Sequence, residues 1–392
     1  MSSPALPTVR DLTTLLDDEL PAAIALRHAI HQDPQLSGNE GATIDQLTEA
    51  LGEPGLRDDH GALMLRVGPD DRSAVAVRAE LDALPIAEST TAPWASRNGS
   101  MHACGHDVHM AALVAVTRAL RAAGAPTPFL AVFQPREETW PSGALDIVAS
   151  GALEAQRVAA MVGIHLQPLL PVGVISALPV TVNAAADEFD ITITGTPGHG
   201  AYPHRTDDPI VAAAQIIQSL QFLVSRQVDP MAPTVITVGS IHGGSAPNAI
   251  PESVALRGTL RTYTSADRER LIAAISSAAQ ATAGVHGCSA ATAIHRGEPP
   301  LANDPRLTIA IANELHAQGF DTSGELRSCG ADDFAFYCEH VPSTMLFYGT
   351  GSGSPDEPHL HSPHFLPSDD YVEGVAKAMM AAYLAAARLI GS

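Results

Sequence analysis

Basic residues are scarce in this chain, where 22 Lys and Arg stand against 43 Asp and Glu among 392 residues. The formal net charge of -21 at pH 7 favours solubility and opposes binding to nucleic acid or to an anionic membrane. Long apolar runs are also missing, since no stretch approaches the roughly 18 uninterrupted apolar residues of a membrane-spanning helix. We therefore expect neither nucleic acid nor a membrane as the main partner.

Cysteine is also sparse, and its spacing indicates no disulfide framework. The four cysteines lie far apart, without a CxxC motif, at Cys104, Cys288, Cys329 and Cys338. The first residues, MSSPALPTVRDLTTLLDDELP, lack a basic segment followed by an apolar run, so no targeting sequence is indicated. A cytoplasmic protein in a reducing compartment is the simplest expectation.

The chain is long enough for two domains. Apolar runs typical of strands (62–68, 73–85, 127–135 and 158–166) alternate with helical patterns (13–34, 105–124 and 144–153). The same rhythm returns in a helix at 306–319, a strand at 343–351 and a last helix at 369–390. This alternation predicts an α/β domain built on a mostly parallel sheet, from residues 1–182 and 296–392.

Between these parts the rhythm changes. Strand patterns at 189–195, 234–241, 254–263 and 288–297 are interrupted by helical patterns at 208–226 and 267–284. The order β-α-β-β-α-β is that of a ferredoxin-like α+β unit, which can be inserted into a host domain. We assign it to residues 183–295.

The stretch MHACGHDVHM holds three histidines and a cysteine within eight positions. Cys104 and His106 would point to opposite sides of a regular helix, so they can share one ion only from a turn, which Gly105 permits. A helix that begins just after them would favour a thiolate at Cys104. For an isolated C-G-H motif, however, a buried thiol beside a surface histidine is the commoner arrangement.

Acidic residues and further histidines follow the ends of several predicted strands. Glu137 and Glu138 come after the strand at 127–135, where neighbouring side chains point to opposite sides, so one could hold a metal and the other act as a base. His165 closes another strand, and Glu80 with Asp82 closes a third. The segment PHLHSPHF adds His359, His361 and His364, among which spacing alone selects none. Each feature is weak alone, but all converge on one edge of the sheet.

In this order and spacing, the motifs RAELDALP, HACGHDVH, QPREE, GIHL, GHGAYPH, PNAIPE, GTLRTY, GADDFAFY and LHSPHF resemble those of the M20 metallopeptidase family. The subgroup is that of hippurate hydrolases, N-acyl-amino-acid hydrolases and indole-acetyl-amino-acid hydrolases. The resemblance covers nearly the whole chain, and the combined set of motifs is highly specific.

The resemblance implies a site for one or two divalent ions, with Cys104, His106, Glu138, His165 and His361 as ligands. It makes Glu137 the general base and Asp82 the carboxylate that orients a metal-binding histidine. Zinc is favoured by the thiolate ligand, although manganese, cobalt or nickel serve other family members. His28, His31, His102 and His109 fall outside the implied ligand set.

In the inserted domain, His199 matches a histidine that crosses a dimer interface to stabilise an oxyanion, which implies a homodimer. Asn248 and Arg261 match positions that hold a substrate carboxylate. Without the resemblance, His199 would be an ordinary loop histidine and Arg261 the polar face of a strand.

The expected function is a metal-dependent amidohydrolase of the aminoacylase or hippurate hydrolase type, which cleaves a small N-acyl amino acid into a carboxylic acid and an amino acid. The alternatives are a dipeptidase or carboxypeptidase of the same superfamily, or a non-catalytic metal-binding or ligand-binding relative. Glu80, Arg136, Trp140 and Pro141 depart from the common family pattern and bear on which acyl group fits.

Overall fold

The computed structural model describes residues 9–125 and 127–391. The first eight residues, which belong to the segment without a targeting pattern, lie outside it. The chain divides into two units: Met1–Val180, Ala302–Leu326 and Asp333–Ser392 form the first, and Thr181–Leu301 with Arg327–Asp332 the second. The second unit thus extends beyond the assigned 183–295. Its extra segment joins because Ser328 N–H donates to Val182 O at 2.8 Å and Ala184 N–H to Ser328 O at 3.2 Å.

The first unit is built on an eight-stranded sheet of order β1-β2-β4-β3-β5-β16-β6-β15. The central strands β4, β3, β5 and β16 pair in parallel, which confirms the predicted α/β class. Continuous apolar runs form them because both faces of a central parallel strand are covered. The strands are β1 (Leu56–Arg57), β2 (Leu63–Val67), β3 (Ala74–Glu80), β4 (Phe129–Gln134), β5 (Val158–Pro171), β6 (Val174–Ser176), β15 (Asp321–Gly324) and β16 (Ser343–Gly351).

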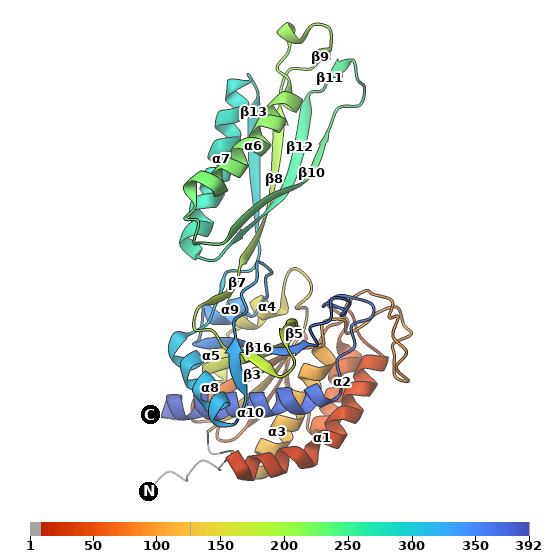
Figure 1. Ribbon diagram of the computed structural model, residues 1–392, viewed down its shortest axis with the longest axis vertical. Helices are drawn as coiled ribbons and strands as arrows, with labels where there is room; N and C mark the ends of the chain where they lie inside the picture. The colour runs from red at the N-terminus through yellow and green to blue at the C-terminus, as the bar shows by residue number, and fades with distance from the viewer. Residues whose placement is uncertain (1–8, 126, 392) are drawn as a thin grey trace. The chain divides into compact units, whose positions relative to one another are not determined.

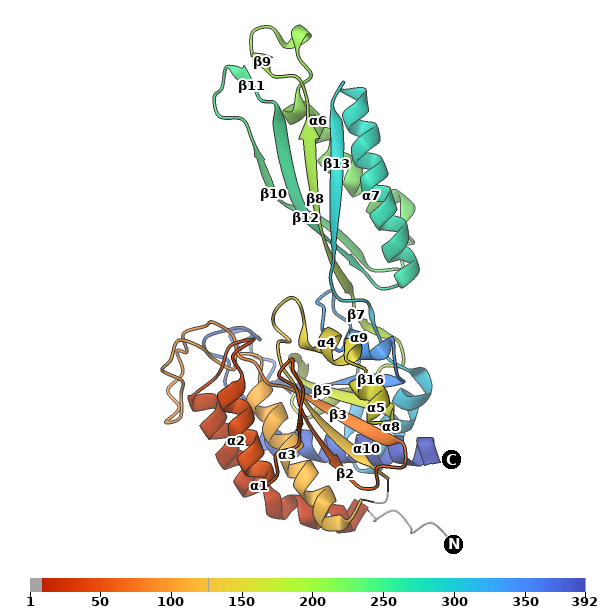
Figure 2. The same ribbon diagram turned by 180° about the vertical axis from the view of Figure 1, so that it is seen from behind.

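Helices cover the sheet of the first unit (Figures 1 and 2). The longer helices contribute to one large apolar core on one face of the sheet. The helices of this unit are α1 (Val9–Gln32), α2 (Gly41–Leu51), α3 (His106–Ala123), α4 (Gly143–Ala149), α5 (Ala152–Ala155), α8 (Pro305–Ala317), α9 (Ala335–Cys338) and α10 (Asp370–Gly391).

Helix α10 is long and apolar enough to cross a bilayer by length and composition alone. In the first unit it packs against α3, α8 and α1 and against strands β3 and β5. Its 18-residue apolar window is 67% buried, as is typical of a core helix.

The second unit contains a four-stranded antiparallel sheet of order β10-β12-β8-β13, with α6 and α7 packed on it. The chain order β8-α6-β10-β12-α7-β13 is the predicted ferredoxin-like pattern. The elements are β7 (Thr181–Asn183), β8 (Ala185–Thr194), β9 (Gly198–His199), η1 (Pro203–Arg205), α6 (Pro209–Gln227), β10 (Thr234–Gly243), β11 (Ala249–Ile250), β12 (Ser253–Thr262), α7 (Ser265–Val285) and β13 (Ser289–Arg296). The chain leaves the unit through β14 (Leu301–Ala302).

Candidate metal and catalytic site

Four segments of the first unit gather the predicted ligands: the turn at the start of α3, the loop after β4, strand β5 and the loop after β16. His165 lies within β5, which continues to Pro171, and does not close the strand as expected. The ligand atoms of the predicted residues form overlapping groups within which all lie within 4.8 Å of one another. One group is Cys104, His106 and His165, a second is Cys104, Glu138 and His361, and a third is His106, Glu137 and Glu138. The structure therefore brings together all five residues expected to hold a metal, together with the expected base.

The turn at Cys104 depends on a glycine. Gly105 has φ +86°, a conformation that L side chains rarely adopt, and a Cβ there would lie 2.9 Å from Cδ1 of Leu166. Helix α3 begins at His106 directly after this turn. The Sγ atom of Cys104 consequently lies 3.4 Å from Nε2 of His165, with both side chains buried.

Backbone carbonyls fix the orientation of two imidazoles. His106 Nδ1 lies 2.8 Å from Asp82 O, and His165 Nδ1 lies 2.7 Å from Leu166 O. A carbonyl only accepts, so each Nδ1 carries a proton, and in the neutral ring each Nε2 keeps its lone pair. Nε2 of His106 is buried and has no hydrogen-bond partner among the described residues. These tautomers suit metal coordination through Nε2.

Asp82 differs in detail from its expected role. Its backbone carbonyl holds His106, while the nearer carboxylate oxygen, Oδ1, lies 3.7 Å from that ring. The other oxygen, Oδ2, accepts from Ser37 Oγ at 2.7 Å and from Glu138 N–H at 2.9 Å. The carboxylate of Asp82 thus fixes the backbone of the glutamate pair.

The two glutamates face the histidines. Oε1 of Glu138 lies 3.2 Å from Nε2 of His361, and Oε2 of Glu137 lies 4.0 Å from Nε2 of His106. His361 N–H donates to Ala103 O at 2.9 Å, which ties the C-terminal loop to the Cys104 turn. Both glutamate side chains are mostly buried, at 12% exposure, whereas His361 is half exposed.

Without a bound cation, the residues around Cys104 do not favour a thiolate. Burial raises the pKa of the Cys104 thiol well above its ordinary value, and the negative charges of Glu138 and Glu137 raise it further. The start of α3 does not offset them. Burial, with His109 and His106 close by, lowers the pKa of His165 to about 3 and keeps that imidazole neutral.

The donor set fits a divalent cation. Buried His106 Nε2 has no hydrogen-bond partner among the described residues, and Glu138 Oε1 faces the half-exposed His361; a cation would satisfy the free Nε2. It would also offset the carboxylates that raise the pKa of Cys104. A set of one sulfur, imidazole nitrogens and one carboxylate suits a borderline transition metal such as zinc.

Contacts of Arg136, which the sequence did not predict, hold the loop that carries Glu137 and Glu138. Arg136 N–H donates to Oε1 of Glu40 at 2.9 Å, and the Arg136 side chain pairs with Asp146. Gly143 N–H closes the loop by donating to Arg136 O at 3.0 Å. Arg136 therefore supports the loop that carries Glu137 and Glu138. Only the segment SGNE, just after the first helical pattern, could have pointed to Glu40.

The other three predicted site residues belong to the second unit. His199 is exposed, and its Nδ1 accepts from Ala201 N–H at 3.0 Å. The carbonyl of Asn248 accepts from Gly200 N–H at 2.8 Å, so the loops that carry His199 and Asn248 adjoin. Arg261, on β12, is half-buried and lowers the pKa of Glu298, which burial raises.

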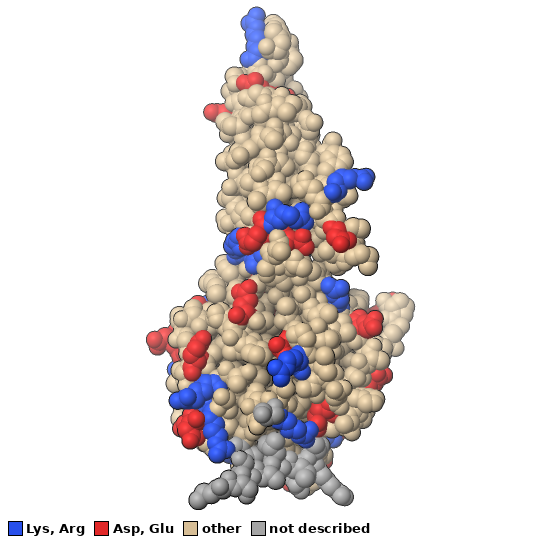
Figure 3. All heavy atoms as spheres, turned by 90° about the vertical axis from the view of Figure 1, so that its left-hand side faces the viewer, with Lys and Arg blue, Asp and Glu red and all other residues tan. Residues whose placement is uncertain are grey.

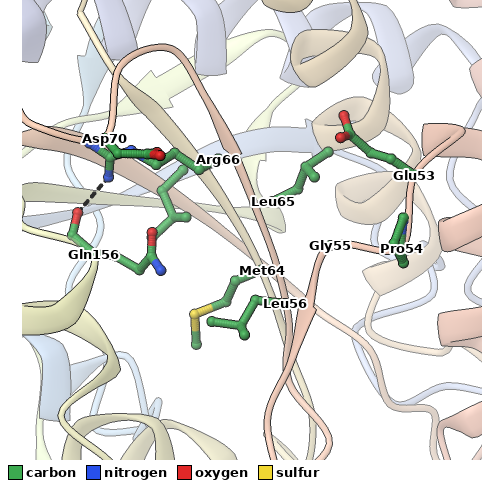
Figure 4. Close-up of a pocket in the computed structure, with 10 residues that line it drawn as sticks. Glu53, Pro54, Gly55, Leu56, Met64, Leu65, Arg66, Asp70 and Gln156 are labelled. Atoms are coloured by element: carbon green, nitrogen blue, oxygen red, sulfur yellow. Dashed lines mark hydrogen bonds and ion pairs between the residues drawn. The ribbon is translucent and has the colours of Figure 1, made fainter.

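One surface hollow contains none of the predicted site residues. A hollow of about 400 Å³ beside β2 is lined by Leu56, Met64 and Arg66 among others (Figure 4). The guanidinium of Arg66 is engaged there by the carbonyls of Gln156, Pro69 and Arg72. On the face drawn in Figure 3, Lys and Arg are interspersed with Asp and Glu.

Known proteins resemble the whole chain. The profile of peptidase family M20/M25/M40 matches residues 76–385. The chain is 34% identical over 407 residues to an N-acetyl-L-cysteine deacetylase of Bacillus subtilis, covering 100% of this chain and 95% of that protein. It is also 34% identical to an N-acetyldiaminopimelate deacetylase of Leuconostoc citreum, covering 86% and 89%.

Two solved structures resemble this chain over nearly their whole length. A putative aminohydrolase from methicillin-resistant Staphylococcus aureus superposes with a TM-score of 0.89 at 28% identity, covering 95% of this chain and 98% of that one. A dinuclear metal-binding peptidase from the M20 family, from Bacillus subtilis, gives 0.83 at 28% identity, covering 95% and 99%.

Proposed function

This chain belongs to peptidase family M20/M25/M40 and is a metal-binding hydrolase of amide bonds, and we propose that its substrates are N-acyl amino acids. The products are then a carboxylic acid and a free amino acid. The observation that carries the hydrolytic part of this proposal is the position of Glu137, a carboxylate 4.0 Å from His106 Nε2 beside the candidate metal donors, while the choice of substrate follows the relatives.

The proposed ligands are Cys104, His106, Glu138, His165 and His361, which would hold one or two divalent ions. Zinc is the proposed metal because a thiolate and imidazoles are among the donors. A bound divalent metal supplies Lewis acidity, lowering the pKa of water to about 7 and polarising the scissile carbonyl.

Glu137 performs the proton transfers in this proposal. Its carboxylate accepts a proton from the attacking water and returns it to the nitrogen of the leaving amine, which departs as a neutral amine. Asp82 supports this step indirectly, because its Oδ2 binds the backbone N–H of Glu138, the neighbour of Glu137.

His199 is proposed to stabilise the oxyanion. Its Nδ1 accepts a hydrogen bond from Ala201, so in the neutral ring Nε2 carries the proton and can donate to a developing negative charge. Arg261 and Asn248 are proposed to bind the carboxylate of the amino-acid part, for which the guanidinium offers a bidentate fork. A homodimer is part of this proposal because His199 would come from a partner.

An N-acyl substrate is favoured over a peptide by the relatives. The deacetylases to which the chain is 34% identical are named for N-acetylcysteine and N-acetyldiaminopimelate, both N-acyl amino acids. A tripeptidase from Staphylococcus aureus has a similar structure, with a TM-score of 0.70, but is only 16% identical, so that likeness concerns the fold alone.

The test is hydrolysis by chelated protein restored with zinc, manganese or cobalt. N-acetyl and N-benzoyl amino acids are compared with simple dipeptides, and light scattering on the same samples measures the oligomeric state. We expect turnover to return with the metal and to favour N-acyl amino acids. A preference for dipeptides would support the peptidase alternative, and bound metal without turnover the binding-protein alternative.

Cytoplasmic localisation is proposed as well, on the wide spacing of the cysteines. Fractionation of the native host, with detection by antibody, tests it.

A further inference from the structure

His109, the last histidine of the HACGHDVH motif, is held on both sides of its ring. It lies buried on α3, one turn after His106. Its Nε2 accepts from the backbone N–H of Leu166 at 3.0 Å, and its Nδ1 lies 2.9 Å from Oε2 of Glu80. The bond from Leu166 requires a lone pair on Nε2, so the proton is on Nδ1 and is donated to Glu80.

This arrangement removes His109 from the possible metal ligands. Both of its nitrogens are engaged by the protein, whereas His106 keeps a buried Nε2 without a hydrogen-bond partner among the described residues. The two rings are close, with centroids 5.7 Å apart. Their different partners thus give neighbouring histidines of one motif different roles.

The residue whose backbone His109 holds also orients His165. Leu166 donates through its N–H to His109 and accepts through its carbonyl from Nδ1 of His165. The side chain of Leu166 lies where a Cβ on Gly105 would collide with it. One residue therefore links the His109 ring, the orientation of His165 and the turn that presents Cys104.

A buried network of charged and polar side chains holds Glu80, the partner of His109 Nδ1. Glu80 pairs with Arg78 on the same strand, β3. Arg78 also donates to Asp333 Oδ1 at 2.7 Å and to Gln134 Oε1 at 2.9 Å, and Gln134 donates to Asp333 Oδ2 at 2.7 Å. These side chains are at most 1% exposed. The carboxylate that fixes His109 is thus itself held on the side facing Arg78.

We propose that Glu80 and His109 are positioning residues that set the metal affinity of the site by holding the backbone of Leu166, and through it His165. The chain of contacts runs from Arg78 to Glu80, His109, Leu166 and His165. This inference rests on the proposed function in one respect, the assignment of His165 as a metal ligand. It adds a role for Glu80 and His109 that involves no contact with the metal or the substrate.

The test measures metal affinity rather than hydrolysis. Purified variants are stripped of metal and titrated with zinc against a chelating indicator, and with cobalt by absorption spectroscopy, which reports the geometry around Cys104 and His165. His109→Phe keeps a planar ring but cannot accept from Leu166 or donate to Glu80. Glu80→Gln keeps the shape but removes the charge, and His109→Gln restores one donor and one acceptor.

We expect His109→Phe to remain folded by circular dichroism and to bind zinc about 10–100-fold more weakly, with a shifted cobalt spectrum, as for other residues that orient metal ligands. Glu80→Gln should follow in the same direction, and His109→Gln should recover part of the affinity. The control is Asp187→Asn, which disturbs the buried Arg268–Asp187 pair of the second unit. It should lower stability and leave zinc affinity unchanged.

Three outcomes would overturn the proposal. A folded His109→Phe variant with wild-type affinity and spectrum would remove the positioning role. An equal loss of zinc affinity in Asp187→Asn would show that the loss comes from general instability of the protein. Failure of the wild-type protein to bind zinc or cobalt would remove the ligand set itself, and would be distinguished from the first outcome because no variant is needed to observe it.

Discussion

The thiol of Cys104 lies 3.4 Å from Nε2 of His165, across 61 residues of sequence. Both side chains are buried, and the carboxylates of Glu137 and Glu138 raise the pKa of the thiol beyond the effect of burial. Without a cation the thiol is therefore protonated and forms a neutral pair with the imidazole of His165. A cation that binds the sulfur and the imidazole nitrogens together would favour the thiolate.

Replacing Cys104 should therefore change the metal preference. We expect Cys104→Ser to weaken zinc binding by at least about tenfold and manganese binding less, because the thiolate selects softer metals. Competition against a chelating indicator measures both affinities. Cys288→Ser is the control, since Cys288 is also buried but lies in the second unit; equal losses in both variants would contradict the assignment.

Metal uptake should release a proton from Cys104. Its raised pKa keeps the metal-free thiol protonated near pH 7, whereas the ligand form is the thiolate. Consequently zinc affinity should rise with pH through the neutral range. An indicator in weak buffer counts the protons, and Cys104→Ser should release about one fewer than wild type. The same count from both proteins would contradict a thiolate ligand.

Gly105 and Gly99 form a matched pair for testing the turn. Both have positive φ, +86° and +89°, but a Cβ would meet Leu166 only at Gly105 and would find open space at Gly99. Alanine at either position should cost roughly 1 kcal/mol of unfolding free energy through backbone strain. Only Gly105→Ala should also weaken zinc binding, because Leu166 adjoins His165. Denaturation and zinc titration separate the two effects.

The exposed indole of Trp140 should contribute to the choice of acyl group. It is 54% exposed, lies two residues after Glu138 and is 6.3 Å from the ring of Phe336. We expect Trp140→Ala to raise KM for N-benzoyl substrates by about tenfold, equivalent to roughly 1.4 kcal/mol of lost apolar contact, and to change KM for N-acetyl substrates less. Leu56→Ala, in the hollow of Figure 4, should change neither.

Much of the first unit follows from local sequence patterns. The apolar runs of β3, β4, β5 and β16 are continuous because central parallel strands are buried on both faces. Because the carboxyl ends of parallel strands lie along one edge of the sheet, Glu138, which follows the apolar run of β4, is predictable as a residue of that edge. The family resemblance then separated His361 from its neighbours His359 and His364.

What the sequence could not provide depends on distant contacts. Arg78 meets Asp333 across 255 positions, and no local period indicates that pairing. The hydrogen bonds of Ser328 to Val182 and Ala184 were equally unpredictable, because backbone groups make them and every residue carries such groups. The electrostatics of Cys104 are a further example: the start of a helix is visible in the sequence, whereas the burial and the carboxylates that raise the pKa of its thiol are not.

The most direct test of the central claim compares two neighbouring isosteric variants, Glu137→Gln and Glu138→Gln. Each is assayed for zinc content and for kcat on the best N-acyl amino acid. The account predicts that Glu137→Gln retains zinc while kcat falls by about 10²–10⁴-fold, and that Glu138→Gln loses zinc affinity first. Full activity in Glu137→Gln, or loss of zinc from it, would contradict the assignment of Glu137 as the base.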